Sequence, residues 1–539
     1  MTDSVQIHLV QQSFLVGDIR ANARKIISLA QAARDAGADL VVFPELALSG
    51  YPPEDLLLRR GFVALCDEAV ADIQRSVTGI DLVFGAPRHD GQKLYNSALC
   101  MRDGALRSVY DKYTLPNYAV FDEKRYFSEG SKPCLLTIKG ITFGITICED
   151  IWIEAPALQA KQAGAQALLV LNASPYHGGK YAERMAALQQ RCVETALPVF
   201  YLNLVGGQDE LVFDGQSLVL TGQGELAGRG VDFEAADLRY RLHTDGRIEP
   251  QQPLADLSSE DASIYRALVY GVRDYVRNNG FQGVVIGLSG GVDSALTLAI
   301  AVDALGADKV MAVMMPSRYT ADMSQHDAEQ QARALGVEYK VIAIESVFNS
   351  FLELLAPSFA GTEPDTTEEN IQARCRGILL MALSNKFQRM VLTTGNKSEM
   401  AVGYCTLYGD MAGGFAPLKD VFKMRVYSLS RYRNSLSAVI PERVLTRPPS
   451  AELRPDQTDQ DSLPAYEVLD AILAMSVEQD HPQRDIVAAG FDEATVERVL
   501  HLVQINEYKR RQAPPGVRIT RRAFGRDRRY PITSGYRRK

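Results

Sequence analysis

The stretch VVIGLSGGVDS, residues 284–294, constrains the fold of this chain more than any other. A short apolar run ends in a turn rich in glycine and serine, and an apolar helical pattern follows at once and stops at Gly306. This order predicts a strand, a phosphate-binding loop and a helix. Gly287, Gly290 and Gly291 allow the backbone to approach a ligand closely, so that N–H groups at a helix N-terminus can face an anion.

The side chains of this loop favour the same chemistry. Ser289 and Ser294 add hydroxyl donors, and Asp293 adds a carboxylate that could hold Mg²⁺ between phosphate oxygens. The loop has no lysine of the G-x-x-x-x-G-K-S/T type, which argues against a grip on a γ-phosphate. A tight turn without a ligand is the alternative. The loop resembles the SGGxDS pyrophosphate loop of the ATP pyrophosphatases, which cleave ATP between the α- and β-phosphates.

The composition is that of a soluble globular protein, with 46% hydrophobic and 23% charged residues among 539. The apolar runs are too short to span a bilayer, and the N-terminus lacks the apolar core of a signal peptide. We therefore expect a cytoplasmic protein with no membrane partner. The seven cysteines are odd in number and include no C-x-x-C pair, which disfavours a zinc site or a disulfide framework.

The last part of the chain is strongly basic, although the net charge is −8. Residues 509–539 hold twelve Lys and Arg side chains against one acidic residue, Asp527. Such a tail could bind nucleic acid, or it could serve a phosphate-bearing small molecule.

In the first half, strands alternate with helices and with several hairpin-like pairs. Residues 18–37 predict an amphipathic helix with Asp18 near its N-cap and Gly37 at its C-terminal stop. Repeated apolar strands followed by polar loops continue to about residue 207. This pattern predicts helices packed over two sheets.

Three polar residues lie after apolar segments of this half: Glu45, Lys112 and Cys148. Singly, each has an ordinary explanation, as a solvated surface charge or a small core residue. Together they could form one catalytic unit. A thiol of pKa about 8.5 needs a base, which Glu45 can supply. Lys112 can stabilise the thiolate and then an oxyanion.

The segments FPELALSGY, DKYTLPNY and ICEDIW are similar to the three signature segments of the nitrilase family, whose members hydrolyse amides and nitriles. The similarity covers residues 1–250 and implies an αββα sandwich. By that resemblance Glu45 is the general base, Lys112 the positioning cation and Cys148 the nucleophile. The residues that it implies for glutamine binding are Tyr118, Ser174 and Lys180.

An amide-hydrolysing half fused to an ATP-cleaving half indicates a glutamine amidotransferase. No cysteine lies in a G-x-C-x-G turn, and residue 2 is Thr, so two other glutaminase types are excluded. The nitrilase-like half is the remaining source of ammonia. Because free ammonia would escape as ammonium, we expect a protected passage between the two sites.

After a linker at 251–263, the second half predicts a helix over 264–278, the phosphate loop, and strands in VMAVMMPS and YKVIAI separated by a helix over 321–335. This is a doubly wound, Rossmann-like α/β pattern over residues 264–539, with ligands at the C-terminal edge of the sheet. A helix over 366–386 is expected to be capped by Thr366 or Thr367.

The segments TEEN, TTGNKSE and EYKRRQAPPGVRI resemble the NAD⁺ synthetase family. So do YGDMAGGFAPLKDVFK and RPPSAELRPDQTDQDSLPAY, which we expect to be mobile loops that close over substrate. The resemblance implies deamido-NAD⁺, ATP and glutamine as substrates, with Mg²⁺. The residues implied are Asn370, Glu399 and Lys509 for deamido-NAD⁺; Gly287, Leu288, Ser289, Gly290, Gly291, Val292, Asp293, Ser294 and Thr394 for ATP; and Asp293 and Glu399 for the metal.

The expected reaction adenylates the nicotinate carboxylate, which ammonia then converts to the amide. The basic tail would partly meet the dinucleotide's phosphates, with the rest solvated or at a subunit interface, and a homo-oligomer is expected. Two alternatives stay open: an amidotransferase acting on a purine nucleotide or an amino acid, and an RNA-binding protein. The acidic chain and the absence of interleaved aromatic residues argue against RNA.

Overall fold

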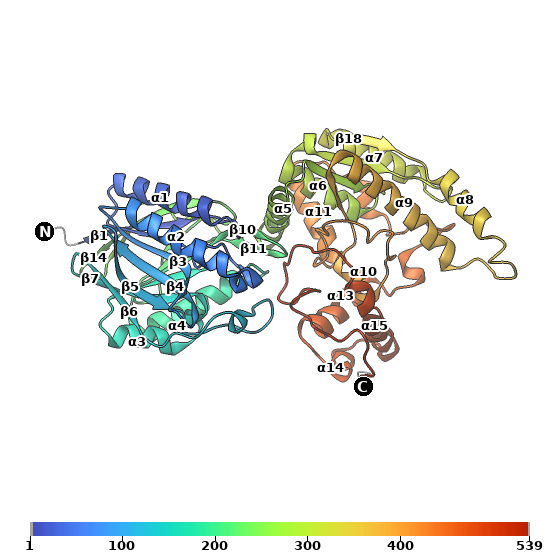
Figure 1. The fold of residues 1–539 in the computed structure, drawn as a ribbon. Helices are drawn as coiled ribbons and strands as arrows, with labels where there is room; N and C mark the ends of the chain where they lie inside the picture. The colour runs from blue at the N-terminus through green and yellow to red at the C-terminus, as the bar shows by residue number, and fades with distance from the viewer. Residues whose placement is uncertain (1–3, 537–539) are drawn as a thin grey trace. The chain divides into compact units, whose positions relative to one another are not determined.

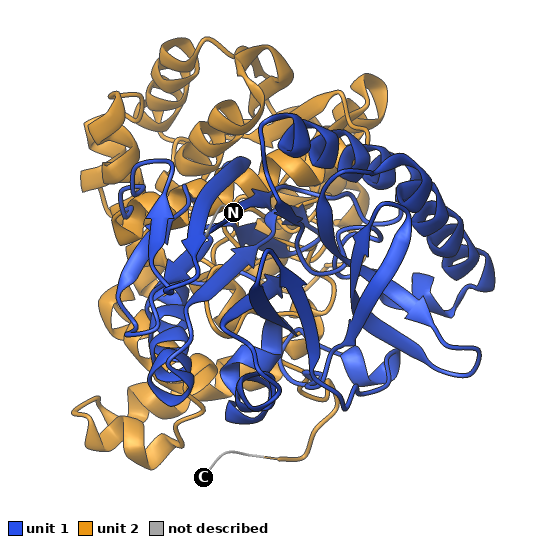
Figure 2. Cartoon of the chain, turned by 90° about the vertical axis from the view of Figure 1, so that its left-hand side faces the viewer, with its two compact units in different colours: residues 1–258 blue, residues 259–539 orange. Residues whose placement is uncertain are grey.

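The computed structural model describes residues 4–536, which fold into two compact units divided between Ser258 and Ser259. Figure 2 colours the two units separately. None of the helices within 4–536 is long and apolar enough to cross a membrane.

Two sheets form the centre of the first unit (Figure 1). The seven-stranded sheet runs β15-β14-β1-β2-β3-β4-β5, and the six-stranded sheet runs β13-β12-β9-β8-β7-β6. The strands are β1 (Ser4–Gln11), β2 (Leu40–Val42), β3 (Asp81–His89), β4 (Leu94–Arg102), β5 (Ala105–Asp111), β6 (Cys134–Ile138), β7 (Ile141–Ile147), β8 (Ala167–Asn172), β9 (Val199–Asn203), β12 (Leu218–Leu220), β13 (Leu226–Arg229), β14 (Ala236–His243) and β15 (Ile248–Pro250), with a separate hairpin of β10 (Val205–Gln208) and β11 (Leu211–Asp214).

Helices cover the outer face of each sheet: α1 (Ile19–Asp35) and α2 (Arg60–Ser76) on one side, α3 (Glu154–Gln162) and α4 (Lys180–Thr195) on the other. Alternation along β2 shows how the sequence builds these layers. Leu40 and Val42 point into the core between the sheets, whereas Val41 packs beneath α1 and α2. The expected αββα sandwich is confirmed.

The second unit contains a parallel sheet in the order β18-β17-β16-β19. Its strands are β16 (Gly283–Gly287), β17 (Val310–Met314), β18 (Glu338–Val341) and β19 (Arg389–Leu392). The helices are α5 (Glu260–Asn278), α6 (Val292–Leu305), α7 (Asp322–Leu335), α8 (Glu345–Leu355), α9 (Thr366–Phe387), α10 (Lys397–Val402), α11 (Lys423–Leu436), α12 (Glu442–Thr446), α13 (Tyr466–Leu473), α14 (Gln483–Ala488), α15 (Glu493–Ile505) and α16 (Glu507–Arg510).

The strand order places a topological switch between β16 and β19. From β16 the chain builds β17 and β18 on one side and then returns to place β19 on the other. In such sheets the loops at the carboxyl ends of the two strands that flank the switch diverge and leave a crevice for ligands. The phosphate loop follows β16 and the TTGNKSE segment follows β19, so the fold brings the two predicted segments together. The expected doubly wound fold is confirmed.

The start of one helix and the capping residue of another differ from the prediction. The side chain of Ser259 accepts from the Ala262 amide, so α5 begins at Glu260, before the expected 264 and within the expected linker. Asp365, rather than Thr366 or Thr367, caps α9, because its carboxylate accepts from the Thr367 amide at 2.7 Å and Glu368 completes a capping box. Asp18 caps α1 as predicted.

The segment 408–423 is packed, not a polar loop over substrate. Phe415, Leu418 and Val421 within it are fully buried. Although this stretch is rich in polar residues and glycine, an apolar residue recurs at every third or fourth position, and these apolar residues anchor it in the interior.

The basic tail is also more buried than expected. Arg510 and Arg528 pair with Glu507 at 2.9 and 2.7 Å, and Arg518 pairs with Asp527 at 2.6 Å. These arginines are buried, so for them a solvated or interfacial position is wrong.

Candidate active sites

The first site begins with two fully buried charges at the ends of two strands of the seven-stranded sheet. Glu45 lies just beyond β2, and Lys112 directly follows β5. The Nζ of Lys112 donates to Oε1 of Glu45 at 2.7 Å. A carboxylate and an ammonium buried without water persist only when each neutralises the other, so the pair is a fixed part of the interior.

Two further donors fix the orientation of Glu45. The side-chain amide of Asn96 donates to Oε1 at 2.8 Å, and the backbone N–H of Ala173 donates to Oε2 at 2.9 Å. Asn96 lies on β4, and Ala173 directly follows β8 in the other sheet. Both sheets therefore hold the expected base in one position.

Glu123 is a second carboxylate on the same lysine, and the sequence analysis missed it. Its Oε1 and Oε2 accept from Lys112 Nζ at 2.8 and 2.9 Å, and Tyr51 donates to it at 2.9 Å. Burial raises the pKa of Glu123 to about 7, against the attraction of Lys112 and with the repulsion of Glu45. One ammonium shared by two carboxylates leaves one of them easily protonated.

Cys148 is presented on a sharp turn at the end of β7. It has φ of +46° and opens the short 3₁₀ helix η3 (Cys148–Trp152). Burial raises the pKa of its thiol, Glu45 adds to the rise, and Lys112 opposes it. Glu45 and Lys112 therefore act on the thiol with the signs expected of a base and a stabilising cation.

Asp150 ties this turn to the loop that carries Lys112. Its carboxylate accepts from the amides of Ile147 at 3.1 Å and Thr114 at 2.7 Å, and from the Tyr110 hydroxyl at 2.8 Å. This hydrogen-bond network connects the segments that carry the three predicted triad residues.

Two of the three residues expected to bind glutamine, Tyr118 and Lys180, contact the η3 turn that Cys148 opens. The hydroxyl of Tyr118, which is 56% exposed, donates to Glu149 at 2.8 Å, next to Cys148. The Ser174 amide donates to Asn203 at 2.9 Å. Lys180 lies at the first position of α4, and burial lowers its pKa, while Cys148 acts in the opposite direction.

Arg184 is a second basic residue near Cys148 that the sequence analysis missed. It is buried, forms two 2.8 Å bonds to Asp214, and donates to the Ser174 carbonyl at 2.9 Å. An arginine at an amphipathic helix position carries no sequence signal that distinguishes it from a surface charge.

The second site begins with the phosphate loop. Gly290 has φ of +80°, and a Cβ there would lie 2.3 Å from the Ser324 carbonyl, so only glycine fits. The Ser289 and Ser294 hydroxyls bond to each other at 3.1 Å and also accept loop N–H groups, from Gly291 and Ser289 respectively. The serines thus hold the loop's shape instead of projecting as free donors.

Three other residues predicted to bind ATP lie in the same loop. Gly287 ends β16, and the side chains of Leu288 and Val292 are buried in the core. These three residues can offer a ligand only their backbone atoms. Thr394 lies half-buried in the loop after β19, at the same edge of the sheet.

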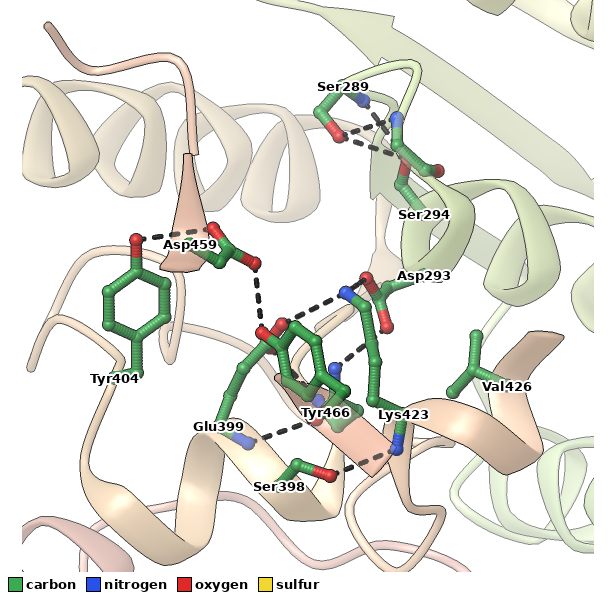
Figure 3. Close-up of polar contacts among 12 residues, drawn as sticks. Ser289, Asp293, Ser294, Ser398, Glu399, Tyr404, Lys423, Val426, Asp459 and Tyr466 are labelled. Atoms are coloured by element: carbon green, nitrogen blue, oxygen red, sulfur yellow. Dashed lines mark hydrogen bonds and ion pairs between the residues drawn. The ribbon is translucent and has the colours of Figure 1, made fainter. Parts of the chain in front are cut away.

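Asp293 and Glu399 meet through a lysine, as Figure 3 shows. Lys423 Nζ lies 2.5 Å from Asp293 Oδ2 and 3.3 Å from Glu399 Oε1. Asn396 donates to the other oxygen of Asp293 at 2.8 Å. Burial raises the pKa of Glu399 to about 8, with Lys423 opposing and Asp293 adding to the rise. The two predicted metal ligands are therefore brought together, around a lysine the sequence analysis missed.

A third carboxylate lies on the other side of Glu399. Asp459 accepts from the hydroxyls of Tyr404 at 3.2 Å and Tyr466 at 2.8 Å (Figure 3). The Lys423 ammonium also lies 5.1 Å from the Tyr466 ring centroid. Asp459 and Tyr466 come from the polar stretch 447–466, so part of that stretch lines the site.

The residues expected to bind deamido-NAD⁺ converge on the segment that follows α10. Thr406 donates to Asn370 Oδ1 at 2.7 Å. Lys509 Nζ donates to the carbonyls of Gly403 at 2.8 Å and Cys405 at 2.9 Å. Since Glu399 lies on α10 itself, all three predicted residues are gathered around one short stretch of chain.

Comparison with known proteins covers both units. A carbon-nitrogen hydrolase family model matches residues 5–241, and an NAD synthase family model matches residues 264–513. The glutamine-dependent NAD(+) synthetase of Xylella fastidiosa is 52% identical over 545 residues, covering 100% of both chains. That of Thermotoga maritima is 45% identical over 571 residues, covering 99% of each. This chain belongs to the glutamine-dependent NAD(+) synthetase family.

A solved family member shares the fold as well. The glutamine-dependent NAD⁺ synthetase from Acinetobacter baumannii, determined in complex with ADP, has a TM-score of 0.81 at 48% identity and covers 99% of this chain and 100% of its own. The predicted fusion of a nitrilase-like half with an NAD synthetase half is confirmed.

Proposed function

We propose that this chain converts deamido-NAD⁺ to NAD⁺ with ATP, using ammonia that its first unit releases from glutamine. Membership of the glutamine-dependent NAD(+) synthetase family supports the overall reaction, a carbon–nitrogen ligation with glutamine as amido donor. The observation that carries the assignment of residues is the buried Glu45–Lys112 pair acting on the strained turn of Cys148.

In the first unit, Glu45 takes the proton of the Cys148 thiol as the thiolate attacks the side-chain amide carbon of glutamine. Lys112 stabilises the negative charge that develops. The amide C–N bond breaks, the proton on Glu45 leaves with ammonia, and a thioester remains. Water then adds to the thioester, with Glu45 as base, and releases glutamate and the thiol.

The glutamine main-chain groups are read by the residues around the turn. Lys180 is the first residue of α4, and the capping residue before it, Gly179, has no side chain that could accept from the N–H groups of the helix start. The Lys180 ammonium and these N–H groups therefore both favour binding of the substrate's α-carboxylate. Ser174 and the exposed Tyr118 complete the binding of glutamine in this proposal.

In the second unit, the nicotinate carboxylate of deamido-NAD⁺ attacks the α-phosphorus of ATP, and pyrophosphate leaves. Residues 287–294 and Thr394 hold the nucleotide, with the N-terminus of α6 directed at the phosphates. Asn370, Glu399 and Lys509 hold deamido-NAD⁺. Ammonia attacks the resulting acyl adenylate, AMP leaves, and a proton is released to give the amide of NAD⁺.

The residues at the switch point fit Mg²⁺. Asp293 and Glu399 both direct oxygens at one cation, the Lys423 ammonium, and carboxylate oxygens are the ligands that Mg²⁺ prefers. Within residues 4–536 no group of three or more His, Cys, Asp or Glu side chains forms a metal site, so phosphate oxygens and water would complete the shell. Bound there, Mg²⁺ would neutralise the phosphates. A cytoplasmic homo-oligomer is part of this proposal.

Pyrophosphate exchange tests the synthetase half of the proposal. With labelled pyrophosphate, ATP and Mg²⁺ but no nitrogen donor, label should enter ATP only when deamido-NAD⁺ is present, because the adenylate forms reversibly. Glu45→Gln should keep this exchange and lose glutamine hydrolysis. Exchange that does not depend on deamido-NAD⁺ would contradict the proposal that an adenylate of deamido-NAD⁺ forms.

A further inference from the structure

The single tryptophan of the chain lies against one of the residues proposed to bind glutamine. Trp152 ends the 3₁₀ helix that Cys148 opens, and Lys180 Nζ lies 4.1 Å from the centroid of its ring. A cation at this distance over the face of an indole is attracted by the ring's negative face, most strongly where water is partly excluded.

The ring also packs against the apolar core of the first unit. Trp152 packs with Tyr181 against the apolar layer that α3 and α4 form over the six-stranded sheet. Ile151, the preceding residue, is buried in the same layer. Since the η3 turn is anchored there and begins at the nucleophile, one short element sets the positions of both the thiol and the ring.

The ring also differs from a carboxylate as a partner for Lys180. Among residues 4–536, the one hydrogen bond that Lys180 Nζ donates goes to Glu183, at 3.3 Å, and Glu183 is shared with His177 Nε2 at 3.4 Å. Burial lowers the pKa of Lys180 and neighbouring Arg184 acts in the same direction, whereas Glu183 opposes the shift. An aromatic face stabilises the ammonium without supplying an anion that would compete with a substrate carboxylate.

We propose that Trp152 is a positioning residue for glutamine: its ring holds the Lys180 ammonium over the mouth of the Cys148 turn, where that ammonium receives the α-carboxylate of the substrate. Trp152 acts through Lys180 and takes no part in bond making. The proposal rests on the proposed role of Lys180 in glutamine binding and assigns a specificity for free α-carboxylates to the pair.

Kinetics on the full chain provide the first test. Trp152→Leu should raise the KM for glutamine roughly 2- to 30-fold, the range of one cation–π contact, with kcat changed less than about twofold. Trp152→Phe keeps an aromatic ring that attracts the cation more weakly, so its KM for glutamine should lie between those of wild type and Trp152→Leu. Tyr181→Leu is the matched control, since Tyr181 adjoins Lys180 and packs on the same layer but pairs with Arg229.

Combining variants separates positioning from general loosening. Trp152→Leu should add little to the rise in KM that Lys180→Met already causes, because both remove one interaction. An unchanged KM in both Trp152 variants would overturn the proposal, and so would an equal rise in Tyr181→Leu.

Fluorescence gives a second readout that needs no change at Trp152. Because the chain holds one tryptophan, its emission in the Cys148→Ala protein reports this ring alone. Added glutamine should produce a saturable change, which glutaramate, lacking the α-amino group but keeping the carboxylate, should reproduce and a glutamine α-amide should not. Lys180→Met should abolish it. If wild type hydrolyses glutamine but no ligand changes the emission, the inference fails; if wild type hydrolyses no glutamine, the proposed function fails first.

Discussion

Each unit contains a buried lysine between two carboxylates, and the two arrangements differ in how far their carboxylates are exposed to solvent. Lys112 and Glu45 are both fully buried, and Glu45 has two further donors. Lys423 lies between Asp293 and Glu399, whose side chains keep 15% and 16% of their surface exposed. The first lysine is enclosed with its carboxylates, whereas the second lies between carboxylates that stay partly exposed, at the position where we propose that the metal and the nucleotide bind.

Removing the closed lysine should have the largest effect. Lys112→Met leaves Glu45 and Glu123 without their cation, and we expect glutamine hydrolysis to fall by at least about 10³-fold. The uncompensated buried charge should also lower the stability of the first unit by about 3–5 kcal/mol. Glutaminase rates and thermal melting measure both effects. Rescue of the rate by added divalent cations would contradict the view of a closed site.

The same change at the open lysine should have the opposite consequence for metal binding. Lys423→Met removes a positive charge from between two carboxylates, so Mn²⁺ should bind roughly tenfold more tightly without nucleotide. Electron paramagnetic resonance of free Mn²⁺ measures the affinity, and Asp293→Asn in the same background should abolish the gain. Equal Mn²⁺ affinity in wild type and Lys423→Met would show that the ammonium does not occupy the metal's position.

A smaller effect concerns the pH dependence of the first site. Since burial raises the pKa of Glu123 to about 7, above the ordinary 4.5, its stabilising contribution is complete below pH 4.5 and is lost as the pH rises through 7. Glu123→Gln removes this dependence. The melting temperature of the variant relative to wild type should therefore increase between pH 5 and pH 7.5. A constant difference would indicate that Glu123 stays ionised throughout.

The smallest effect is expected at the exposed rim. Tyr118→Phe loses one hydrogen bond to Glu149, worth about 0.5–1.5 kcal/mol. The KM for glutamine should rise by roughly 2- to 13-fold, with kcat unchanged. A fall in kcat without a change in KM would move Tyr118 from substrate binding to the chemical step.

The sequence predicted those features that local patterns encode. Glu45 and Cys148 come after buried apolar strands, Lys112 follows the more exposed β5, and the phosphate loop joins a strand to a helix, so their placement at the ends of strands could be expected. The switch point then brings Asp293 and the segment of Glu399 together, which follows from the strand order.

The missed residues are partners across long separations. Lys423 is 130 residues from Asp293, and nothing in the spacing of either segment indicates that they meet. Glu123 is only 11 residues from Lys112, but it opens a three-residue 3₁₀ helix within a long connection that no periodicity describes. The cap of α9 differs from the prediction for a local reason: Glu368 completes a capping box with Asp365.

The most direct test of the account is NAD⁺ formation from deamido-NAD⁺, ATP and Mg²⁺ with either glutamine or ammonium as nitrogen donor, in wild type and Cys148→Ala. The account predicts that the variant loses glutamine-dependent synthesis and keeps ammonium-dependent synthesis, because the thiol serves only the first unit. Glutamine-dependent synthesis that survives in Cys148→Ala would contradict it.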